Sequence, residues 1–129
     1  MKQIKKKLLG FTLIEMVTVI AVTGVLAATV TQKVTTVNAD ARQAALNSVA
    51  GILETAGASN HSAHGANSAN GIAVLNCSTT TNLLQTALDT TVYAITAQSV
   101  LADATVNCTL STVSTPVLTT TYLAYGIGV

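Results

Sequence analysis

Apolar residues are spread unevenly along this chain, and the longest apolar stretch lies near its start. Between residues 8 and 32 the sequence is almost continuously apolar, and Glu15 is the only ionisable side chain in it. About 20 mostly apolar residues are enough for a helix to cross a bilayer. The stretch therefore predicts a transmembrane helix, with Gly24 as its weakest point because glycine is a poor helix former.

Beyond this stretch the apolar residues recur at steps of three and four, as they do on one face of a helix. The predicted apolar stripe comprises Val34, Val37, Ala41, Ala44, Ala45, Val49, Ile52, Leu53 and Ala56. The polar residues Lys33, Asp40, Arg42, Gln43, Asn47 and Glu54 lie largely away from it. No proline interrupts this region, and Gly57 predicts a helix end. We expect one long helix from about residue 11 to 57, followed by a polar surface loop over residues 58–71.

The C-terminal half has the pattern of a small sheet. Three segments rich in β-branched residues and bounded by turn residues predict strands, at residues 92–97, 105–110 and 117–125. A fourth short apolar run, residues 72–75, is compatible with a strand, and residues 82–88 predict a short helix capped by Ser78, Thr79 or Thr80. The fold class is α+β, a long N-terminal helix packed on an antiparallel sheet of three to four strands.

Charge separates the first residues from the rest. Charged residues make up 9% of the chain, against about 25% in an ordinary soluble domain. Four lysines lie at the start (Lys2, Lys5, Lys6 and Lys7), whereas from Phe11 onward two basic residues face five acidic ones, a balance of −3. Nothing there resembles the basic patch of a nucleic-acid-binding protein. Few charges indicate a membrane segment or a surface covered by other subunits.

The acidic Glu15 within the apolar run distinguishes this N-terminus from an ordinary export signal. Lysines before an apolar run are typical of an export signal and hold the N-terminus in the cytoplasm, so the remainder faces the periplasm. A carboxylate in an apolar helix is costly without a partner. Cleavage after Gly10 would create an α-amino group on Phe11 and make Glu15 the fifth residue. In an assembly of parallel helices, the amine of one copy could then meet Glu15 of its neighbour, and Glu15 would also face the positive end of its own helix dipole.

The sequence KKKLLG-FTLIE of residues 5–15 resembles the class III leader of type IV pilins and of type II secretion pseudopilins. The resemblance implies that a prepilin peptidase cuts between Gly10 and Phe11 and N-methylates Phe11. It also implies a pilin fold, an inner-membrane precursor, a pilus assembly machinery and a homopolymer on the cell surface that binds an unknown surface receptor. The corresponding organisation is a leader (residues 1–10), a membrane or filament-core half-helix (11–32) and an external globular domain (33–129).

Later segments resemble the mannose-sensitive haemagglutinin-type pilins of gammaproteobacteria. These segments are Asp40-Ala41-Arg42, Val49-Ala50-Gly51, Gly71-Ile72-Ala73-Val74 before Asn76-Cys77, and Tyr93-Ala94-Ile95-Thr96 before Cys108. An even pair of cysteines in an exported chain predicts a disulfide, Cys77–Cys108, and two reduced thiols are the alternative. Twenty-one residues follow Cys108, so the last strand would lie outside the disulfide loop, unlike the usual arrangement in pilins.

No enzymatic site, cofactor or metal is predicted. His61 and His64 are three residues apart, but we expect them to be exposed loop residues without further ligands nearby. Asp89 and Asp103 are too few for a calcium loop, which weighs against a major pseudopilin. The threonine runs, including residues 79–81 and 119–121, favour β-structure over O-glycosylation, and the sequons at Asn60, Asn76 and Asn107 carry little weight. A pseudopilin and a membrane-anchored binding module remain the alternatives to a pilus subunit.

Overall fold

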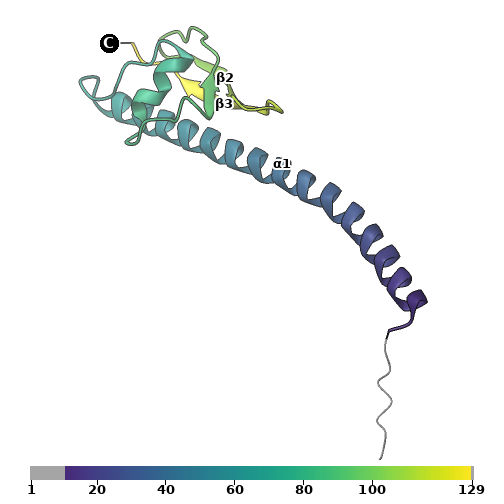
Figure 1. Cartoon of the computed structure of the whole chain (residues 1–129). Helices are drawn as coiled ribbons and strands as arrows, with labels where there is room; N and C mark the ends of the chain where they lie inside the picture. Colours follow the sequence, from purple (N-terminus) through teal and green to yellow (C-terminus); the bar gives the residue numbers. More distant parts are fainter. Residues whose placement is uncertain (1–10, 129) are drawn as a thin grey trace, which may run out of the picture. The chain divides into compact units, whose positions relative to one another are not determined.

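The computed structural model describes residues 11–128, with no description of the side chains of residues 29–36. The chain divides into two compact units, Met1–Ala39 and Asp40–Val129. One helix, α1 (Leu13–Ala66), contributes to both. The second unit also holds a 3-10 helix, η1 (Cys77–Leu83), and the strands β1 (Tyr93–Ile95), β2 (Thr105–Thr112) and β3 (Thr119–Tyr125) (Figure 1).

The three strands form one antiparallel sheet in the order β1-β2-β3. Cys108 of β2 lies opposite Tyr122 of β3, and Ile95 of β1 lies opposite Leu110 of β2. The predicted α+β arrangement, a helix packed on a small antiparallel sheet, is confirmed. The run at residues 72–75 is not a strand of this sheet, because only Val74 pairs there, in an isolated bridge to Ile127.

The helix continues past Gly57, where the sequence predicted its end, and reaches Ala66. Gly57 is a buried residue within the helix, and a Cβ there would be in ordinary van der Waals contact with the Tyr125 ring, at 3.4 Å. Further along, the Asn60 side chain accepts from the backbone N–H of Ile72 (2.8 Å) and donates to its carbonyl (2.8 Å). These tertiary contacts hold a polar segment helical although its composition is typical of a loop.

A helix was expected over residues 82–88, but the structure has η1 earlier in the chain. The side chain of Asn76 caps it by accepting from the N–H of Ser78 (3.0 Å). The hydroxyls of the three following threonines donate to the carbonyls three residues before them, at 2.7–3.0 Å. Local hydroxyl bonds of this kind compete with a regular α-helix, and the three-residue spacing matches the hydrogen-bond step of a 3-10 helix.

The buried face of α1 differs from the predicted stripe. Leu46, Ala50 and Leu53 enter the core, where they meet Cys108, Leu110, Tyr122 and Ala124 of the sheet. By contrast Ile52 is 55% exposed and Val37 64% exposed. The stripe was therefore wrong in phase. Among its described side chains only Leu53 is fully buried, and the side chain of Val34 lies outside those described.

Polar side chains of α1 explain this shift. Strand β3 is an edge strand, so one side of its backbone has no strand partner. The Glu54 carboxylate accepts from the N–H of Leu123 (3.1 Å), and the Gln43 side chain donates to the carbonyl of Thr119 (3.4 Å). The helix thus turns residues that were expected to face solvent toward β3, because backbone groups at a covered edge need hydrogen-bond partners.

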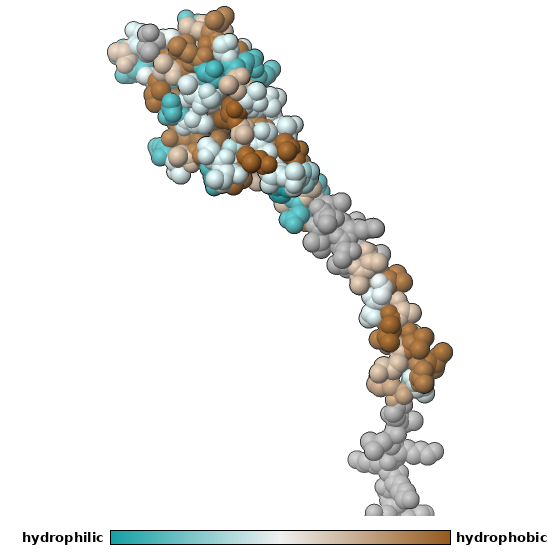
Figure 2. All heavy atoms as spheres, turned by 45° about the horizontal axis from the view of Figure 1, so that its top comes forward, coloured by the Kyte–Doolittle hydropathy of each residue, from teal (hydrophilic) through white to brown (hydrophobic). Residues whose placement is uncertain are grey.

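The start of α1 has a different surface. Ten of the eighteen large apolar side chains that are exposed among the described residues lie in residues 11–28. Figure 2 shows this surface as predominantly hydrophobic, whereas the Asp40–Val129 unit presents a mixed one. In the described part of the chain, no helix combines the length and the hydropathy required to cross a membrane.

Candidate assembly site at the start of the helix

The predicted cleavage point lies at the edge of the described chain. Gly10 is outside the described residues, and Phe11 is 81% exposed and lies two residues before α1 begins. A chain that starts at Phe11 would therefore present its amine just before the first helical turn. The N-methylation of Phe11 remains a prediction.

Thr12 and Glu15 form a reciprocal cap at this end of the helix. The Glu15 carboxylate accepts through Oε2 from the backbone N–H of Thr12 (2.7 Å) and from its hydroxyl (2.9 Å). The Thr12 hydroxyl in turn accepts from the N–H of Glu15 (3.4 Å), and the Thr12 carbonyl accepts from the N–H of Met16 (3.2 Å). This is a capping box, which satisfies N–H groups that the helix itself leaves unpaired.

The cap also fixes the direction of the Glu15 carboxylate. Both hydrogen bonds from Thr12 go to Oε2, and neither uses Oε1. A carboxylate has about four lone-pair sites, so Glu15 can hold its own helix start and still accept from an amine of another copy. Intrachain capping and pairing between copies are compatible at this residue.

Sequence reasoning identified Glu15 but missed Thr12. The signal was present, since a Ser or Thr followed three residues later by an acid, just before an apolar run, is typical of a capping box. It was overlooked because the acid alone suggested a partner in another subunit.

The two predicted cysteines are bonded to each other. Cys77 at the start of η1 and Cys108 in β2 form a disulfide whose Cα atoms are 5.6 Å apart, and both side chains are fully buried. Strand β3 follows Cys108, so it lies outside the 77–108 disulfide loop. The disulfide therefore links η1 covalently to β2.

A buried hydroxyl pair lies beside this disulfide. The Tyr122 hydroxyl is 2.7 Å from the Thr80 hydroxyl and donates to the carbonyl of Cys77 (3.2 Å). Burial raises the pKa of Tyr122, and the hydrogen bond with Thr80 partly opposes that rise. The arrangement keeps Tyr122 neutral and ties β3 to η1.

The two histidines are not loop residues, because α1 includes both. His61 stacks on Tyr125, with ring centroids 5.6 Å apart, and the Nδ1 atom of His64 lies 3.0 Å from the carbonyl oxygen of Asn70. Asp89 bonds to its neighbour Thr91 at 2.6 and 2.9 Å, and these bonds lower the pKa of Asp89. These residues have structural roles in the helix end and in the turn before β1.

The start of the chain matches a known family model. Residues 5–31 match the model of the prokaryotic N-terminal methylation motif. This match supports a type IV pilin-like prepilin leader in this chain, and it includes Thr12 and Glu15. Searches of curated proteins and of solved structures gave no significant match.

Proposed function

We propose that the protein is the structural subunit of a type IV pilus, which polymerises into an extracellular filament. The methylation-motif match over residues 5–31 carries this proposal, and it falls on the segment whose large apolar side chains are exposed. A leader of this kind is processed by a prepilin peptidase and feeds a pilus-type assembly pathway.

The proposed sequence of events begins at the inner membrane. The precursor is anchored there with its lysines in the cytoplasm, following the positive-inside bias. Removal of residues 1–10 frees the Phe11 amine, which is then methylated. The assembly machinery extracts the subunit and adds it to a growing filament.

In the filament, burial among other copies replaces the burial of the apolar segment in lipid. Val19, Ile20 and Val22 are 53–68% exposed in the single chain, and burying such a side chain contributes about 1.5–3 kcal/mol relative to its exposure to water. Glu15 has a second task, since an unused carboxylate oxygen can accept from the Phe11 amine of a neighbour. That pair would set the register between copies.

Mass measurement tests the proposal directly. The intact mass of the protein in sheared surface filaments should correspond to methylated residues 11–129, two hydrogens short because of the disulfide. The same mass confined to short periplasmic assemblies would indicate a pseudopilin. Full-length protein found only in membranes would contradict processing and favour an anchored binding module.

A pair of variants tests the role of Glu15. Glu15→Ala should leave leader removal intact and reduce filament yield sharply, because both the cap and the intermolecular acceptor are lost. Thr12→Val is the matched control, since it removes the hydroxyl of the cap and keeps the carboxylate. If both variants lose filaments equally, Glu15 acts only as a cap; normal filaments from Glu15→Ala would remove the register role altogether.

A further inference from the structure

The turn that follows α1 contains the dipeptide Asn70-Gly71, and Asn70 is the only asparagine of the chain that precedes a glycine. Both residues are exposed. An asparagine can lose its side-chain amide when the next backbone nitrogen attacks the side-chain carbonyl carbon. A following glycine favours this attack, because it has no Cβ to obstruct the approach and its backbone is the least restricted. The dipeptide is therefore chemically predisposed to deamidation.

The structure holds the backbone around this dipeptide by hydrogen bonds that do not involve the reacting groups. The N–H of Asn70 donates to the carbonyl of Asn67 (2.8 Å), and the N–H of Ile72 donates to the side chain of Asn60 (2.8 Å). Neither the side-chain amide of Asn70 nor the N–H of Gly71 has a hydrogen-bond partner among the described residues. The attacking nitrogen and the carbon that it attacks are thus not held apart by other contacts.

His64, in the last turn of α1, lies where it can promote the attack. Its Nδ1 atom is 3.0 Å from the carbonyl oxygen of Asn70, and because a carbonyl oxygen only accepts, Nδ1 carries the proton in this hydrogen bond. That carbonyl belongs to the peptide bond whose nitrogen, in Gly71, must lose its proton. The resulting negative charge is shared with the carbonyl oxygen by peptide resonance, so the N–H of His64 stabilises it.

The same close approach requires a glycine at position 71. Gly71 has a φ of 101°, which residues with a side chain rarely adopt. A Cβ there would also lie 3.1 Å from the Cβ of His64, tighter than an ordinary contact. The contact with His64 and the reactive dipeptide therefore depend on the same residue.

Two nearby asparagines lack this combination. The Asn60 side chain uses both its oxygen and its nitrogen in hydrogen bonds with the backbone of Ile72. The Asn67 side chain accepts from the N–H of Ala69 (3.0 Å). Each of these asparagines precedes a residue with a side chain, so both serve as internal controls for Asn70.

We propose that Asn70 is a site of spontaneous deamidation in the folded protein, promoted by the Nδ1–H of His64. The Gly71 nitrogen loses its proton to solvent and bonds to the side-chain carbon of Asn70, and the side-chain nitrogen takes up a proton and leaves as ammonia. The cyclic imide then adds one water at either carbonyl, which breaks one C–N bond and gives aspartate or isoaspartate. The net reaction consumes one water and releases one ammonia.

The product changes both charge and backbone just beyond the end of α1. A carboxylate at residue 70 adds a negative charge near the C-terminal end of the helix, where the helix dipole disfavours it. Isoaspartate also adds a methylene to the backbone, which shifts the position of Ile72 relative to Asn60. Because the reaction needs no enzyme, the altered form accumulates with the age of the molecule. The inference concerns the Asp40–Val129 unit and does not depend on the pilus function.

Ageing of the purified, processed subunit tests the proposal. The folded protein is kept in mildly alkaline buffer, and mass-spectrometric peptide mapping follows each asparagine. Asn70 should gain about 1 Da as a mixture of aspartate and isoaspartate. Its conversion should be about tenfold faster than that of Asn60 and Asn67, which corresponds to a barrier lower by about 1.4 kcal/mol. An intact Asn70, or conversion no faster than at the two control asparagines, would overturn the proposal.

Substitution of His64 tests its part in the reaction. His64→Leu should slow deamidation of the folded protein about fivefold, because the hydrogen bond to the Asn70 carbonyl is lost. His64→Gln can donate to the same oxygen and should retain part of the rate, and His61→Leu is the matched control on α1. In denaturant all these proteins should react alike. An unchanged or higher rate in folded His64→Leu would overturn the role of His64.

Discussion

The two ends of α1 differ in how far their apolar side chains are buried. In the Asp40–Val129 unit the helix buries Leu46 and Leu53 against a sheet of its own chain, to 0% and 1% exposure. In residues 11–28 large side chains such as Leu13 (83%) and Ile20 (68%) stay exposed. The globular unit buries its core residues within one chain, whereas the large apolar side chains of residues 11–28 stay exposed in it.

This difference predicts how each region responds to substitution. Changes in the globular core should lower the unfolding free energy of the single subunit. Assembly should then decrease because less folded subunit is available. Changes to the exposed apolar side chains of residues 11–28 should leave the subunit stable in detergent and act on assembly alone.

The largest effect is expected from loss of the disulfide. Replacing Cys77 and Cys108 together by alanine removes a cross-link across 31 residues, which in the chain-entropy model costs about 3–4 kcal/mol of unfolding free energy. Denaturant unfolding of the processed subunit measures it. Ile20→Ala in the apolar segment is the counterpart, and it should leave the denaturation midpoint unchanged and reduce filament yield.

Adjacent residues on α1 provide the next test. Leu53→Ala should cost about 3 kcal/mol, because it empties a fully buried site in the core. Ile52→Ala should change the unfolding free energy much less, because Ile52 is 55% exposed. Equal losses of unfolding free energy in the two variants would contradict the assignment of Leu53 to the core and of Ile52 to the surface.

The cap at Thr12 should have a smaller and local effect. Thr12→Val removes one partner of the capping box and should cost about 1 kcal/mol of helix-start stability. Backbone amide exchange near Leu13 and Met16, measured in detergent, should become about fivefold faster. Thr18→Val is the control, because the Thr18 hydroxyl donates to the carbonyl of Glu15 within the helix (2.9 Å) and caps nothing.

Substitution of Tyr122 should have an effect of similar size and adds a pH dependence. Tyr122→Phe should cost about 1 kcal/mol at neutral pH, since it removes buried hydrogen bonds. Burial raises the folded-state pKa of Tyr122 above the usual 10.0. Well below pH 10 Tyr122 keeps its proton in both the folded and the unfolded state. Above pH 10 the unfolded state loses the proton first, so the free energy of unfolding falls as the pH rises toward the folded-state pKa.

The unaltered protein should therefore lose stability more steeply above pH 10 than Tyr122→Phe does. Denaturant midpoints between pH 8 and 11 compare the two directly. Parallel curves would mean that Tyr122 ionises as easily when folded as when unfolded.

Local patterns predicted much of this fold and missed contacts that are distant in sequence. Three strands and the helix were recognised because each has its own periodicity. The helix end was placed at Gly57 because glycine is a common stop, but the contact between Gly57 and Tyr125 joins residues 68 positions apart. The apolar stripe failed for the same reason, since Glu54 and Gln43 face an edge strand that a helical pattern cannot reveal.

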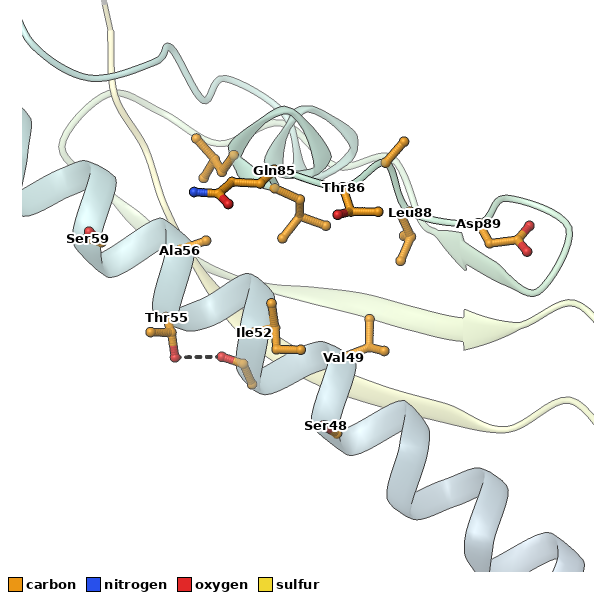
Figure 3. Close-up of a pocket in the computed structure, with 14 residues that line it drawn as sticks. Ser48, Val49, Ile52, Thr55, Ala56, Ser59, Gln85, Thr86, Leu88 and Asp89 are labelled. Atoms are coloured by element: carbon orange, nitrogen blue, oxygen red, sulfur yellow. Dashed lines mark hydrogen bonds between the residues drawn. The ribbon is translucent and has the colours of Figure 1, made fainter.

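The candidate site was predicted in part. Charge, apolar length and one acid indicated Gly10, Phe11 and Glu15, while the role of Thr12 emerged only from its hydrogen bonds with Glu15. The open groove between residues 48–59 of α1 and residues 83–89 (Figure 3) was not predicted, because its two walls lie far apart in the sequence.

By itself the sequence determined the leader pattern, the long helix, a small antiparallel sheet of three to four strands and the cysteine pair, since each depends on neighbouring residues or on composition. Only the tertiary structure decided which face of α1 is buried, where α1 ends and that an open groove lies beside it. The physical reason is the same in each case. A helix rich in alanine and valine has apolar residues on several faces, and the sheet it meets selects among them through hydrogen bonds and shape.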